Sequence, residues 1–488
     1  MNRNDVVRLT IEDISTEGRG IGRADGMAVF VKDTVVGDVV EAEITKVKKN
    51  YAFGQVKEYI KKSNDRIEVL CPYNERCGGC IYQELNYESQ LMLKKKQVTD
   101  KIIRLGGIKY PDIKDTIGME SPFYYRNKAV MPISTGGLIT KKGGIVNPVH
   151  EPRVGFYRAK SHEVIDCGDC LLQSEPAMAA AEAVRRFMEE DNITSYDERW
   201  DKGLMKSMTV RTAFGSGQVM VIFAINGKGI PNAEKLVRML DEAIYEIGSD
   251  ENGSSETYGF NLESVILNIQ KKGGPAGGEW ITLAGRPVIT EFVGGLEFEI
   301  SPKSFYQVNP VQMEMLYGKA IEYAALTGEE TVLDLYCGVG TIGLFFADYM
   351  RKQGGKGRVI GIESVKEAVI DANRNAVING IVNARYICGK AEEELPKLMK
   401  GNYDDKGIGV DKADVVILDP PRAGCDERLL DAVAELSPEK IIYISCDPAT
   451  LSRDIKRLSE KGYGFCEATP VDMFPWTGAI EVAALLKR

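Results

Sequence analysis

Residues 333–347 read LDLYCGVGTIGLFFA and place a glycine-rich turn between an apolar strand-length run and an apolar helix-length run. Gly338, Gly340 and Gly343 match the pattern G-x-G-x-x-G, in which small residues let the backbone approach a bound ligand. Dinucleotide sites and methyl-donor sites both use this turn, and a tight turn without a ligand can also produce it. The segment therefore predicts a strand, turn and helix without choosing the ligand.

Around this turn, apolar strand-length runs alternate with helix-length stretches. The runs are TVLDLY (331–336), RVIGIE (358–363), RYIC (385–388), DVVILD (414–419) and KIIYIS (440–445). Such alternation is typical of a parallel sheet with helices on both faces, so residues 301–488 are expected to form an α/β, Rossmann-like domain. The last two runs, FCEATPVDM and AIEVAALLKR, are separated only by FPWTG. This connection is too short for a crossover helix, and we expect the two strands to pair antiparallel.

Acidic residues stand in or directly after three of these strands. Asp334 lies inside the first strand, and Glu363 ends the second, where a carboxylate can accept both hydroxyls of a ribose. Asp419 opens the rigid loop Asp419-Pro420-Pro421-Arg422 at the carboxyl edge of the sheet. Neither this loop nor an antiparallel final hairpin is expected of a nicotinamide enzyme, whereas S-adenosyl-L-methionine-dependent methyltransferases have both. We therefore expect S-adenosyl-L-methionine as the cofactor.

Two residues near the C-terminus are candidates for chemistry. Cys446 follows the fifth strand in SCDPATLSRD, on the same sheet edge as Gly338 and Asp419. A cysteine at a strand end is often only a small apolar residue, but an open edge beside a cofactor suits a reactive thiolate. Glu481 is a lone acid in the apolar run GAIEVAALL, where a carboxylate without a partner is rarely left buried. We predict a raised pKa for Glu481, which would suit a general base.

The N-terminal 60 residues read as short strands with glycine punctuation. VVRLTIEDI, MAVFVKD, DVVEAEITKVKK and YAFGQVKEYI are predicted strands, and STEGRGIGRADG (15–26) is a predicted loop, which together suggest a small five-stranded barrel. Through GRGIGRADGMAVFV and GDVVEAEI the segment resembles the TRAM domain, an OB-like RNA-binding module. A purely structural barrel is the alternative. We take 1–62 as this domain, 63–300 as a central α+β domain and 301–488 as the domain carrying the glycine turn.

Composition indicates an ordinary soluble chain with an uneven charge distribution. The 488 residues are 44% hydrophobic and 27% charged, with a net charge of -9. Residues 94–160 nevertheless hold 14 Lys and Arg against five acids, so one face could meet a polyanion, although solvated surface charges are the alternative. The start of the chain lacks a signal sequence, and no long apolar run predicts a membrane span. We expect a cytoplasmic protein without a membrane association, and a monomer with no obligate protein partner.

The central segment opens with a helix-like stretch at ELNYESQLMLKKKQVTDKIIRL (84–105), includes the strand-like run YRNKAVMPI, and has an exposed turn predicted at KGGPAGG (272–278). It also holds five cysteines: Cys71, Cys77, Cys80, Cys167 and Cys170. In an intracellular protein such thiols favour metal binding over disulfides. The two C-x-x-C pairs could hold zinc, but that would leave Cys71 unused. An iron-sulfur cluster held by four thiolates and scattered structural cysteines are the other interpretations.

Taken together, these motifs resemble the bacterial RNA uracil-5-methyltransferase family, and specifically its iron-sulfur-bearing 23S ribosomal RNA branch. The likeness covers almost the whole chain and rests on SFYQVNP (304–310), LDLYCGVGTIGL, GIE, DPPRAG, YISCDPATLSRD and DMFPWTGAIEVAALL, in that order. It implies that the methyl donor is bound by Gln307, Tyr336, Gly338, Glu363 and Asp419. It also implies a 4Fe-4S cluster on Cys71, Cys77, Cys80 and Cys170, with Cys167 as an extra thiol. The cluster would hold the central domain in an RNA-binding shape.

The resemblance gives Cys446 and Glu481 their roles. Carbon 5 of uracil is a poor nucleophile, and a thiolate that adds to carbon 6 converts the ring into an enolate whose carbon 5 can take a methyl group. A general base must then remove the carbon 5 proton before the thiolate leaves, and Glu481 is the candidate. Many relatives have Pro-His-Thr and His-Val-Glu where this chain has Pro475-Trp476-Thr477 and Ala479-Ile480-Glu481. The surroundings of the base are therefore less well predicted than the base itself.

Three alternatives stay open. A transfer RNA is the alternative substrate, although members of the family that act on transfer RNA often lack the barrel and the cluster. The glycine turn together with the cysteines would also fit a nicotinamide-dependent iron-sulfur oxidoreductase. A non-catalytic RNA-binding or assembly protein would have no use for both Cys446 and Glu481.

Overall fold

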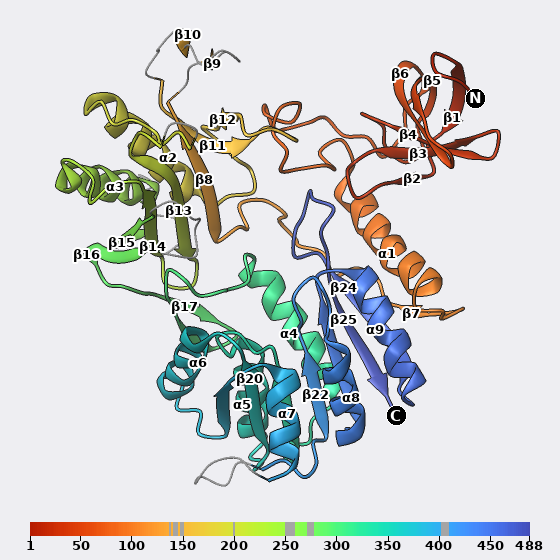
Figure 1. Cartoon of the computed structure of the whole chain (residues 1–488), viewed down its shortest axis with the longest axis vertical. Coiled ribbons are helices and arrows are strands. Elements are labelled where there is room, and N and C mark those ends of the chain that lie inside the picture. The colour runs from red at the N-terminus through yellow and green to blue at the C-terminus, as the bar shows by residue number, and fades with distance from the viewer. Residues whose placement is uncertain are drawn as a thin grey trace.

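The protein has three parts arranged around a common centre (Figure 1). The computed structural model describes residues 1–135, 138–139, 145–146, 151–198, 201–248, 259–270, 278–401 and 409–488. An N-terminal barrel lies beside a central sheet with its helices, and both lie above a larger C-terminal sheet. The turn predicted at 272–278 falls almost entirely outside the described residues. No helix in the described ranges is long and apolar enough to cross a membrane.

The barrel is a six-stranded sheet of order β1-β5-β6-β4-β3-β2. Its strands are β1 (Val6–Thr10), β2 (Asp13–Ile14), β3 (Gly20–Ala24), β4 (Met27–Val31), β5 (Val39–Val47) and β6 (Tyr51–Lys61). The prediction of a loop over residues 15–26 was wrong, because Gly20–Ala24 is a strand. Its glycines are required by close packing: a Cβ at Gly20 would meet Thr34 Oγ1 at 2.1 Å, and one at Gly22 would meet the Thr10 carbonyl at 2.7 Å.

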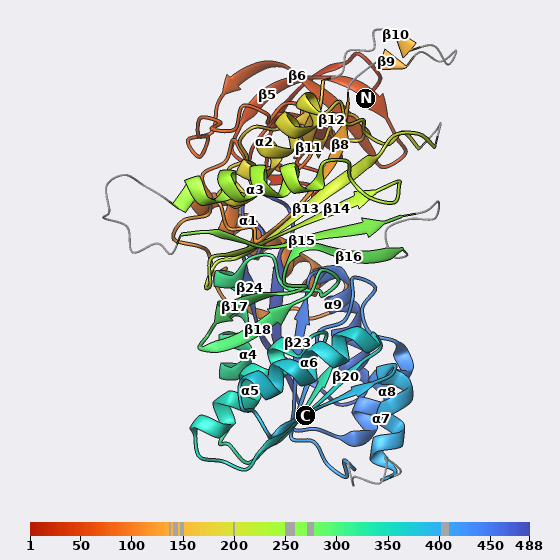
Figure 2. The same ribbon diagram turned by 90° about the vertical axis from the view of Figure 1, so that its left-hand side faces the viewer.

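The central part is a seven-stranded sheet covered on its outer face by two helices (Figure 2). Its order is β12-β11-β8-β13-β14-β15-β16. The elements are β8 (Lys128–Ser134), β11 (Arg153–Tyr157), β12 (Val164–Asp166), α2 (Glu175–Glu190), β13 (Met205–Ala213), β14 (Gln218–Ile225), α3 (Ala233–Gly248), β15 (Asn261–Ile269) and β16 (Glu279–Gly285). Two further strands, β9 (Leu138–Ile139) and β10 (Ile145–Val146), pair with each other. Alternate residues of β8, β13 and β14 pack under α2 and α3.

The C-terminal sheet confirms the predicted alternation. Its eight strands run in the order β21-β20-β19-β22-β23-β25-β24-β7. They are β19 (Thr331–Leu335), β20 (Arg358–Glu363), β21 (Ala384–Cys388), β22 (Val415–Leu418), β23 (Lys440–Ser445), β24 (Gly464–Val471), β25 (Glu481–Lys487) and β7 (Asp112–Ile113). β19 to β23 pair in parallel, and β25 pairs antiparallel with both β23 and β24, as expected for the final hairpin.

Helices cover both faces of this sheet and bury two apolar cores. They are α4 (Pro310–Ala324), α5 (Thr341–Lys352), α6 (Lys366–Ile378), α7 (Ala391–Met399), α8 (Glu427–Leu436) and α9 (Pro448–Glu460). A hairpin of β17 (Ile289–Val293) and β18 (Leu296–Ile300) packs into the same core as α4 and α5. The carboxyl ends of the parallel strands meet at one edge, where ligands of such sheets bind.

One segment assigned to the central domain packs against the C-terminal sheet. Helix α1 (Tyr87–Arg104) begins where the Asn86 side chain accepts a hydrogen bond of 2.8 Å from Ser89 N, and it confirms the predicted helix. Its Val98 and Ile102 enter the core beside β23 and β24. β7 then adds to the sheet edge in parallel with β24. The domain limits at 62 and 300 stay a prediction, and this bridging segment was not foreseen.

Candidate active site

The glycine turn joins β19 to α5 with the backbone conformation that glycine favours. Gly338 and Gly340 have φ of +54° and +79°. A Cβ on Gly343 would meet Asp334 Oδ2 at 2.8 Å, so the helix start can approach that carboxylate only without a side chain. Asp334 Oδ2 accepts a hydrogen bond from Gly343 N at 3.0 Å. Asp334 Oδ1 is buried without a hydrogen-bond partner among the described residues, and a ligand with an N–H donor would satisfy it.

Glu363 at the end of β20 forms the second wall of this site. Its carboxylate accepts hydrogen bonds from Gly338 N at 3.1 Å and from Val365 N at 2.8 Å. Beside it lies a cavity of about 430 Å³. The lining includes Tyr336, Ile362, Ser364, Lys390, Gly424 and Asp426. Tyr336 itself has a φ of +69°, an uncommon backbone conformation for a residue with a side chain.

Asp419 and Gln307 approach the same edge from other segments. Asp419 follows β22, and burial raises its pKa to about 7. Burial also raises the pKa of Asp334 to about 7, with a further contribution from the charge of Asp419. Gln307 is buried in the loop before α4, where its carbonyl accepts a hydrogen bond of 2.9 Å from Asn127 Nδ2. A cationic ligand in this acidic pocket would favour the charged carboxylates.

Cys446 lies directly after β23, at the start of α9. Asp447 caps this helix, because its side chain accepts a hydrogen bond of 2.7 Å from Ala449 N, and Pro448 occupies the first helical position. Burial, followed by the carboxylates of Glu481 and Asp419, raises the pKa of the half-buried Cys446 thiol to about 11, while Arg422 acts in the opposite direction. The thiol therefore lies close enough to Glu481 and Asp419 for both carboxylates to raise its pKa.

Glu481 is the first residue of β25, and the register of the sheet brings it to Cys446. Ser445 pairs with Val482 across the antiparallel strands β23 and β25. Cys446, which follows Ser445, therefore lies level with Glu481, which precedes Val482. Glu481 is 4% exposed. Burial, and then the charge of Asp419, raise its pKa well above the ordinary value, and Arg422 opposes the shift. Within the described chain this carboxylate has no hydrogen-bond or ion-pair partner.

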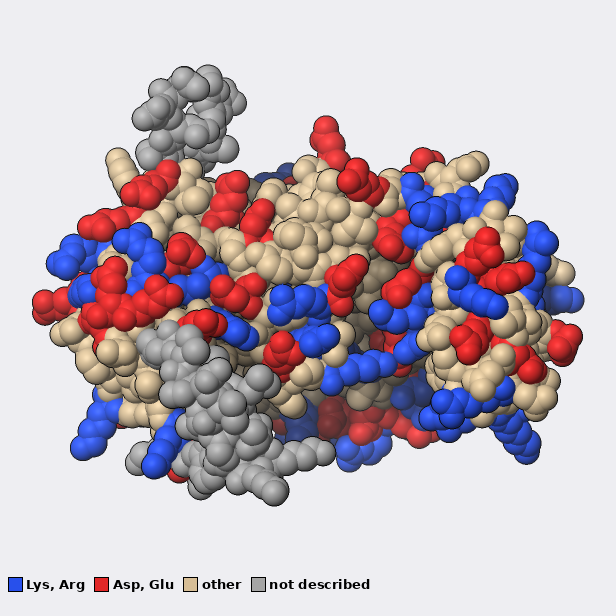
Figure 3. Space-filling model, turned by 90° about the horizontal axis from the view of Figure 1, so that it is seen from above, with Lys and Arg blue, Asp and Glu red and all other residues tan. Residues whose placement is uncertain are grey.

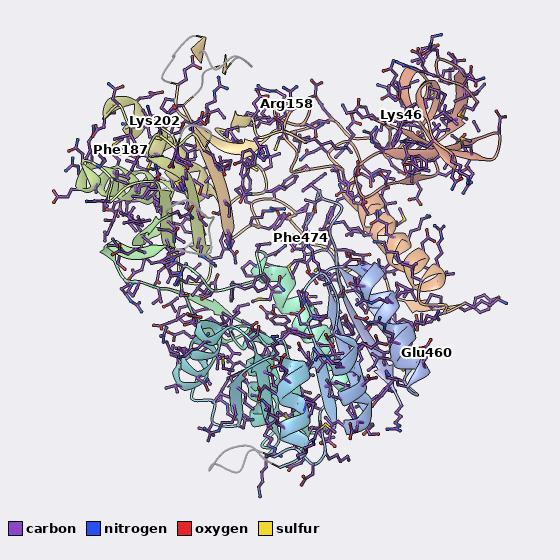
Figure 4. All side chains as sticks on the ribbon, in the orientation of Figure 1. Lys46, Arg158, Phe187, Lys202, Glu460 and Phe474 are labelled. Carbon is purple, nitrogen blue, oxygen red and sulfur yellow. The ribbon has the colours of Figure 1, made fainter. Side chains whose placement is uncertain are left out.

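The loop between β24 and β25 fixes the position of Glu481 and is held by the bridging segment. Figure 4 shows its Phe474 near the centre of the molecule. Asp472 forms a fully buried ion pair with Lys94 of α1. Trp476 Nε1 donates to the Pro122 carbonyl at 2.8 Å, and the ring stacks on Phe123 with a centroid distance of 5.2 Å. Trp476, which stands in the Pro475-Trp476-Thr477 stretch, thus fills a packed apolar pocket.

The cysteines of the central segment gather around the same loop. Cys80 and Cys170 pack against the cluster that contains Trp476. Burial, and then the charges of Cys170, Cys77 and Cys71, raise the pKa of Cys80 to about 12, so the four thiols lie within electrostatic range of one another. In the described ranges, however, no three His, Cys, Asp or Glu side chains are arranged to hold a metal ion. The four thiols match the ligands of an iron-sulfur cluster in type and number, but they do not surround a single metal ion in these ranges.

Cys167 and Arg126 modify the electrostatics of this cysteine site. The neighbouring buried Cys167 thiol has the largest effect on Cys170 and lowers its pKa, and the charge of Arg126 acts in the same direction. Sequence reasoning gave no role to Arg126 or to Arg422, the cation beside Cys446 and Glu481. The signal for Arg422 was its place in the Asp419-Pro420-Pro421-Arg422 loop. Arg126 had no comparable signal.

Comparison with known proteins matches both ends of the chain to described families. Residues 293–488 match the tRNA (uracil-5-)-methyltransferase family, and residues 2–57 match the TRAM domain. An uncharacterized RNA methyltransferase of Clostridium acetobutylicum is 41% identical, with 100% of this chain and 98% of that relative covered. One from Caldanaerobacter subterraneus subsp. tengcongensis is 42% identical over 98% of this chain and 97% of its own length.

A solved structure resembles the whole chain. The tRNA (uracil-54, C5)-methyltransferase of Pyrococcus abyssi, determined in complex with S-adenosyl-L-homocysteine, is 26% identical. It superimposes with a TM-score of 0.70 over 98% of this chain and 100% of its own length. The likeness therefore includes the barrel, the central sheet and the C-terminal sheet together.

Proposed function

This chain belongs to the S-adenosylmethionine-dependent RNA (uracil-5-)-methyltransferases with an N-terminal TRAM domain, and from that premise we propose that Cys446 is the nucleophile and Glu481 the general base. The observation that carries the proposal is the register of β23 and β25, which sets these residues at one level, in the same sheet whose β19 leads into the glycine turn. The reaction requires a thiol, a base and a pocket for the methyl donor, and the candidates for all three lie at one edge of the sheet.

In the proposed reaction Cys446, as a thiolate, adds to carbon 6 of the uracil ring and forms a carbon–sulfur bond. The ring electrons move to the enolate oxygen at carbon 4, and carbon 5 becomes nucleophilic. When bound, S-adenosylmethionine supplies an electrophilic methyl group on its sulfonium. Once carbon 5 is methylated, Glu481 removes the remaining carbon 5 proton, the double bond between carbons 5 and 6 re-forms, and the thiolate leaves. Arg422 stabilises the anionic forms of both residues.

The proposed donor site consists of Gln307, Tyr336, Gly338, Glu363 and Asp419. Glu363 lies beside the 430 Å³ cavity, which suits a ribose and a base. Asp334 was noted in the sequence as an acid inside the first strand, and it supports the same site because its free Oδ1 needs a donor. These acidic side chains would attract the sulfonium of the bound donor.

We propose that the substrate is 23S ribosomal RNA. The support is the combination of the barrel with the cysteine site, which the family pattern associates with ribosomal targets. A transfer RNA is the second candidate, because the solved relative from Pyrococcus abyssi is named for transfer RNA. Incubating the purified protein with the labelled donor and with separate 23S ribosomal and transfer RNA pools from a strain lacking the gene separates them. Label in 5-methyluridine of the ribosomal pool is expected, and label in the transfer RNA pool alone overturns this choice.

We propose that Cys71, Cys77, Cys80 and Cys170 hold a 4Fe-4S cluster. It would supply a structural cross-link between the central segment and the loop that carries Glu481, since Cys80 and Cys170 pack beside Trp476. Polar methyl transfer needs no redox step, so the thiols act only by holding these segments together. Protein prepared without oxygen should contain four iron and four sulfide per chain, and a stoichiometric zinc content would contradict the assignment.

A further inference from the structure

Two cations lie side by side on the central sheet, and no anionic partner is found for them among the residues that the structure describes. Lys128 begins β8, and its cross-strand neighbour in β13 is Arg211. Directly opposed residues on antiparallel strands place their Cβ atoms about 5 Å apart on the same face. Arg211 is 4% exposed and Lys128 is half-buried, so water screens their repulsion incompletely.

The described residues offer these cations no carboxylate. Arg211 donates hydrogen bonds only to the carbonyls of Ser304 and Pro302, at 2.5 and 3.4 Å, and its Nε is buried without a partner. Lys128 has no hydrogen bond or ion pair in the described ranges. Burial lowers the pKa of Arg211 to about 10, and burial together with Arg211 lowers that of Lys128 to about 8. A buried charge without a counterion costs several kcal/mol, so an anion bound beside this pair would offset part of that cost.

The position of the pair identifies the source of the anion. Lys128 lies on the face of the sheet opposite α2 and α3, because its neighbours Ala129 and Met131 point into the helix-covered core. Val130, two residues along on the same face as Lys128, is 53% exposed, so this face is open near the pair. Figures 1 and 2 show that it turns inward, away from the two helices and toward the barrel. Viewed from above, the surface is hollowed between the two lobes, with both basic and acidic side chains around the hollow (Figure 3).

Arg211 also connects this face to the proposed active site. The Ser304 carbonyl that it binds lies three residues before Gln307 of the proposed donor site. We propose that Lys128 and Arg211 form a binding site for one phosphodiester group of the RNA substrate, close to the target nucleotide. The site deepens the proposed function and rests on it for the identity of the RNA. A phosphate oxygen can accept a hydrogen bond from Lys128 Nζ, and the charge of the neighbouring Arg211 adds to the attraction.

The test variant is Lys128→Met, which keeps most of the side-chain volume and removes the charge. We expect RNA affinity to fall about tenfold, as is typical for loss of one charge-assisted hydrogen bond. The slope of log affinity against log salt should decrease by about 0.7, the value for one phosphate of a single strand. The thermal midpoint should stay the same or rise, because the free protein loses an uncompensated charge. Lys128→Arg should restore both affinity and slope.

Lys235→Met is the matched control, since Lys235 lies on α3 on the other side of the same sheet and pairs with Asp191 and Glu190. It should leave RNA affinity and salt slope unchanged. Wild-type RNA affinity and slope in Lys128→Met would overturn the site. So would a loss confined to S-adenosylhomocysteine affinity, measured by calorimetry, because the cations would then serve the donor's carboxylate. If the wild-type protein methylates no uridine but retains a Lys128-dependent slope, the proposed function fails and the phosphate site stands.

Discussion

The two ends of the loop between β24 and β25 carry buried carboxylates with opposite surroundings. Asp472, directly after β24, pairs with Lys94 and accepts a hydrogen bond of 2.9 Å from Tyr87 Oη. Glu481, at the start of β25, has no such partner in the described chain. Both side chains are almost completely buried. The compensated acid anchors the loop, and the uncompensated acid is the residue that we propose as the general base.

Burial alone does not determine whether a carboxylate is charged. A buried acid with a cation is stabilised in its charged form, whereas burial without a cation raises the pKa. Glu481 feels only Arg422 as a favourable charge, against Asp419 and burial. Mutations at the two ends of the loop should therefore have different effects. Changes at Lys94 and Asp472 should lower the stability of the protein, and changes at Cys446 and Glu481 should lower the rate of methylation.

The largest effect is expected at the nucleophile. Cys446→Ala should abolish methylation, with a loss of at least about 10⁴-fold, because no other group can add to carbon 6. It should also fail to form a covalent complex with RNA that contains 5-fluorouridine, observed on a denaturing gel. The exposed Cys466 offers the control, since Cys466→Ala should trap the RNA normally. A Cys446→Ala protein that still traps the RNA would remove Cys446 from its role.

The next largest effect is expected at the buried ion pair of Lys94 and Asp472, which anchors the loop between β24 and β25. Lys94→Met leaves Asp472 buried without its cation and should lower the free energy of unfolding by about 3–5 kcal/mol, measured by urea denaturation. The double change Lys94→Met with Asp472→Leu should recover most of this loss. Lys95→Met is the control, because its partner Asp115 is 97% exposed, and less than about 1 kcal/mol should be lost. Equal losses for Lys94→Met and Lys95→Met would contradict the anchor.

A pH profile sharpens the comparison at the reactive end. In the proposed reaction the thiolate of Cys446 is the active form, and the pKa of this thiol, about 11, lies above the assay range. The carboxylate of Glu481 must also be deprotonated, and its pKa is raised as well. Deprotonation of either group should increase the rate, so kcat/KM should rise with pH between 7 and 9. The rise should be about tenfold per pH unit where deprotonation of the Cys446 thiol alone limits the rate. A flat profile over this range would contradict the raised pKa of Cys446.

The smallest effect is expected at the nearby cation. Arg422→Gln removes the charge that lowers the pKa of both Cys446 and Glu481. The pH profile should move upward by about half a unit, which is about threefold in rate at fixed pH. Arg422→Lys keeps the charge and should keep the profile. An unchanged profile in Arg422→Gln would show that this exposed side chain does not act on the reacting groups.

Local signals predicted the C-terminal sheet, and several of the proposed site residues, such as Glu363, Asp419 and Cys446, stand at or directly after the ends of its strands. The roles of these residues stay a prediction. Apolar runs located β19 to β23, and the short FPWTG connection predicted the antiparallel partner of β24. The same reasoning failed for Gly20–Ala24, where glycines indicate close packing inside a strand and were taken as a loop. Composition cannot distinguish these two uses of glycine without the neighbouring strands.

The contacts that sequence reasoning missed join residues far apart in the chain. Lys94 and Asp472 pair across 378 positions, and neither residue has a local motif. The Lys128–Arg211 pair depends on the register of β8 against β13, which a one-residue shift would remove. The sequence showed that Trp476 replaces an expected histidine. It did not show that Trp476 would fill a pocket formed by the bridging segment.

The most direct test is intact and peptide mass spectrometry of Glu481→Gln after reaction with RNA and S-adenosylmethionine, followed by nuclease digestion. If Cys446 attacks carbon 6 and Glu481 removes the carbon 5 proton, a methylated uridine nucleotide should accumulate on the peptide that contains Cys446, with little free product. Release of 5-methyluridine RNA at the wild-type rate, with Cys446 unmodified, would contradict the assignment of the base.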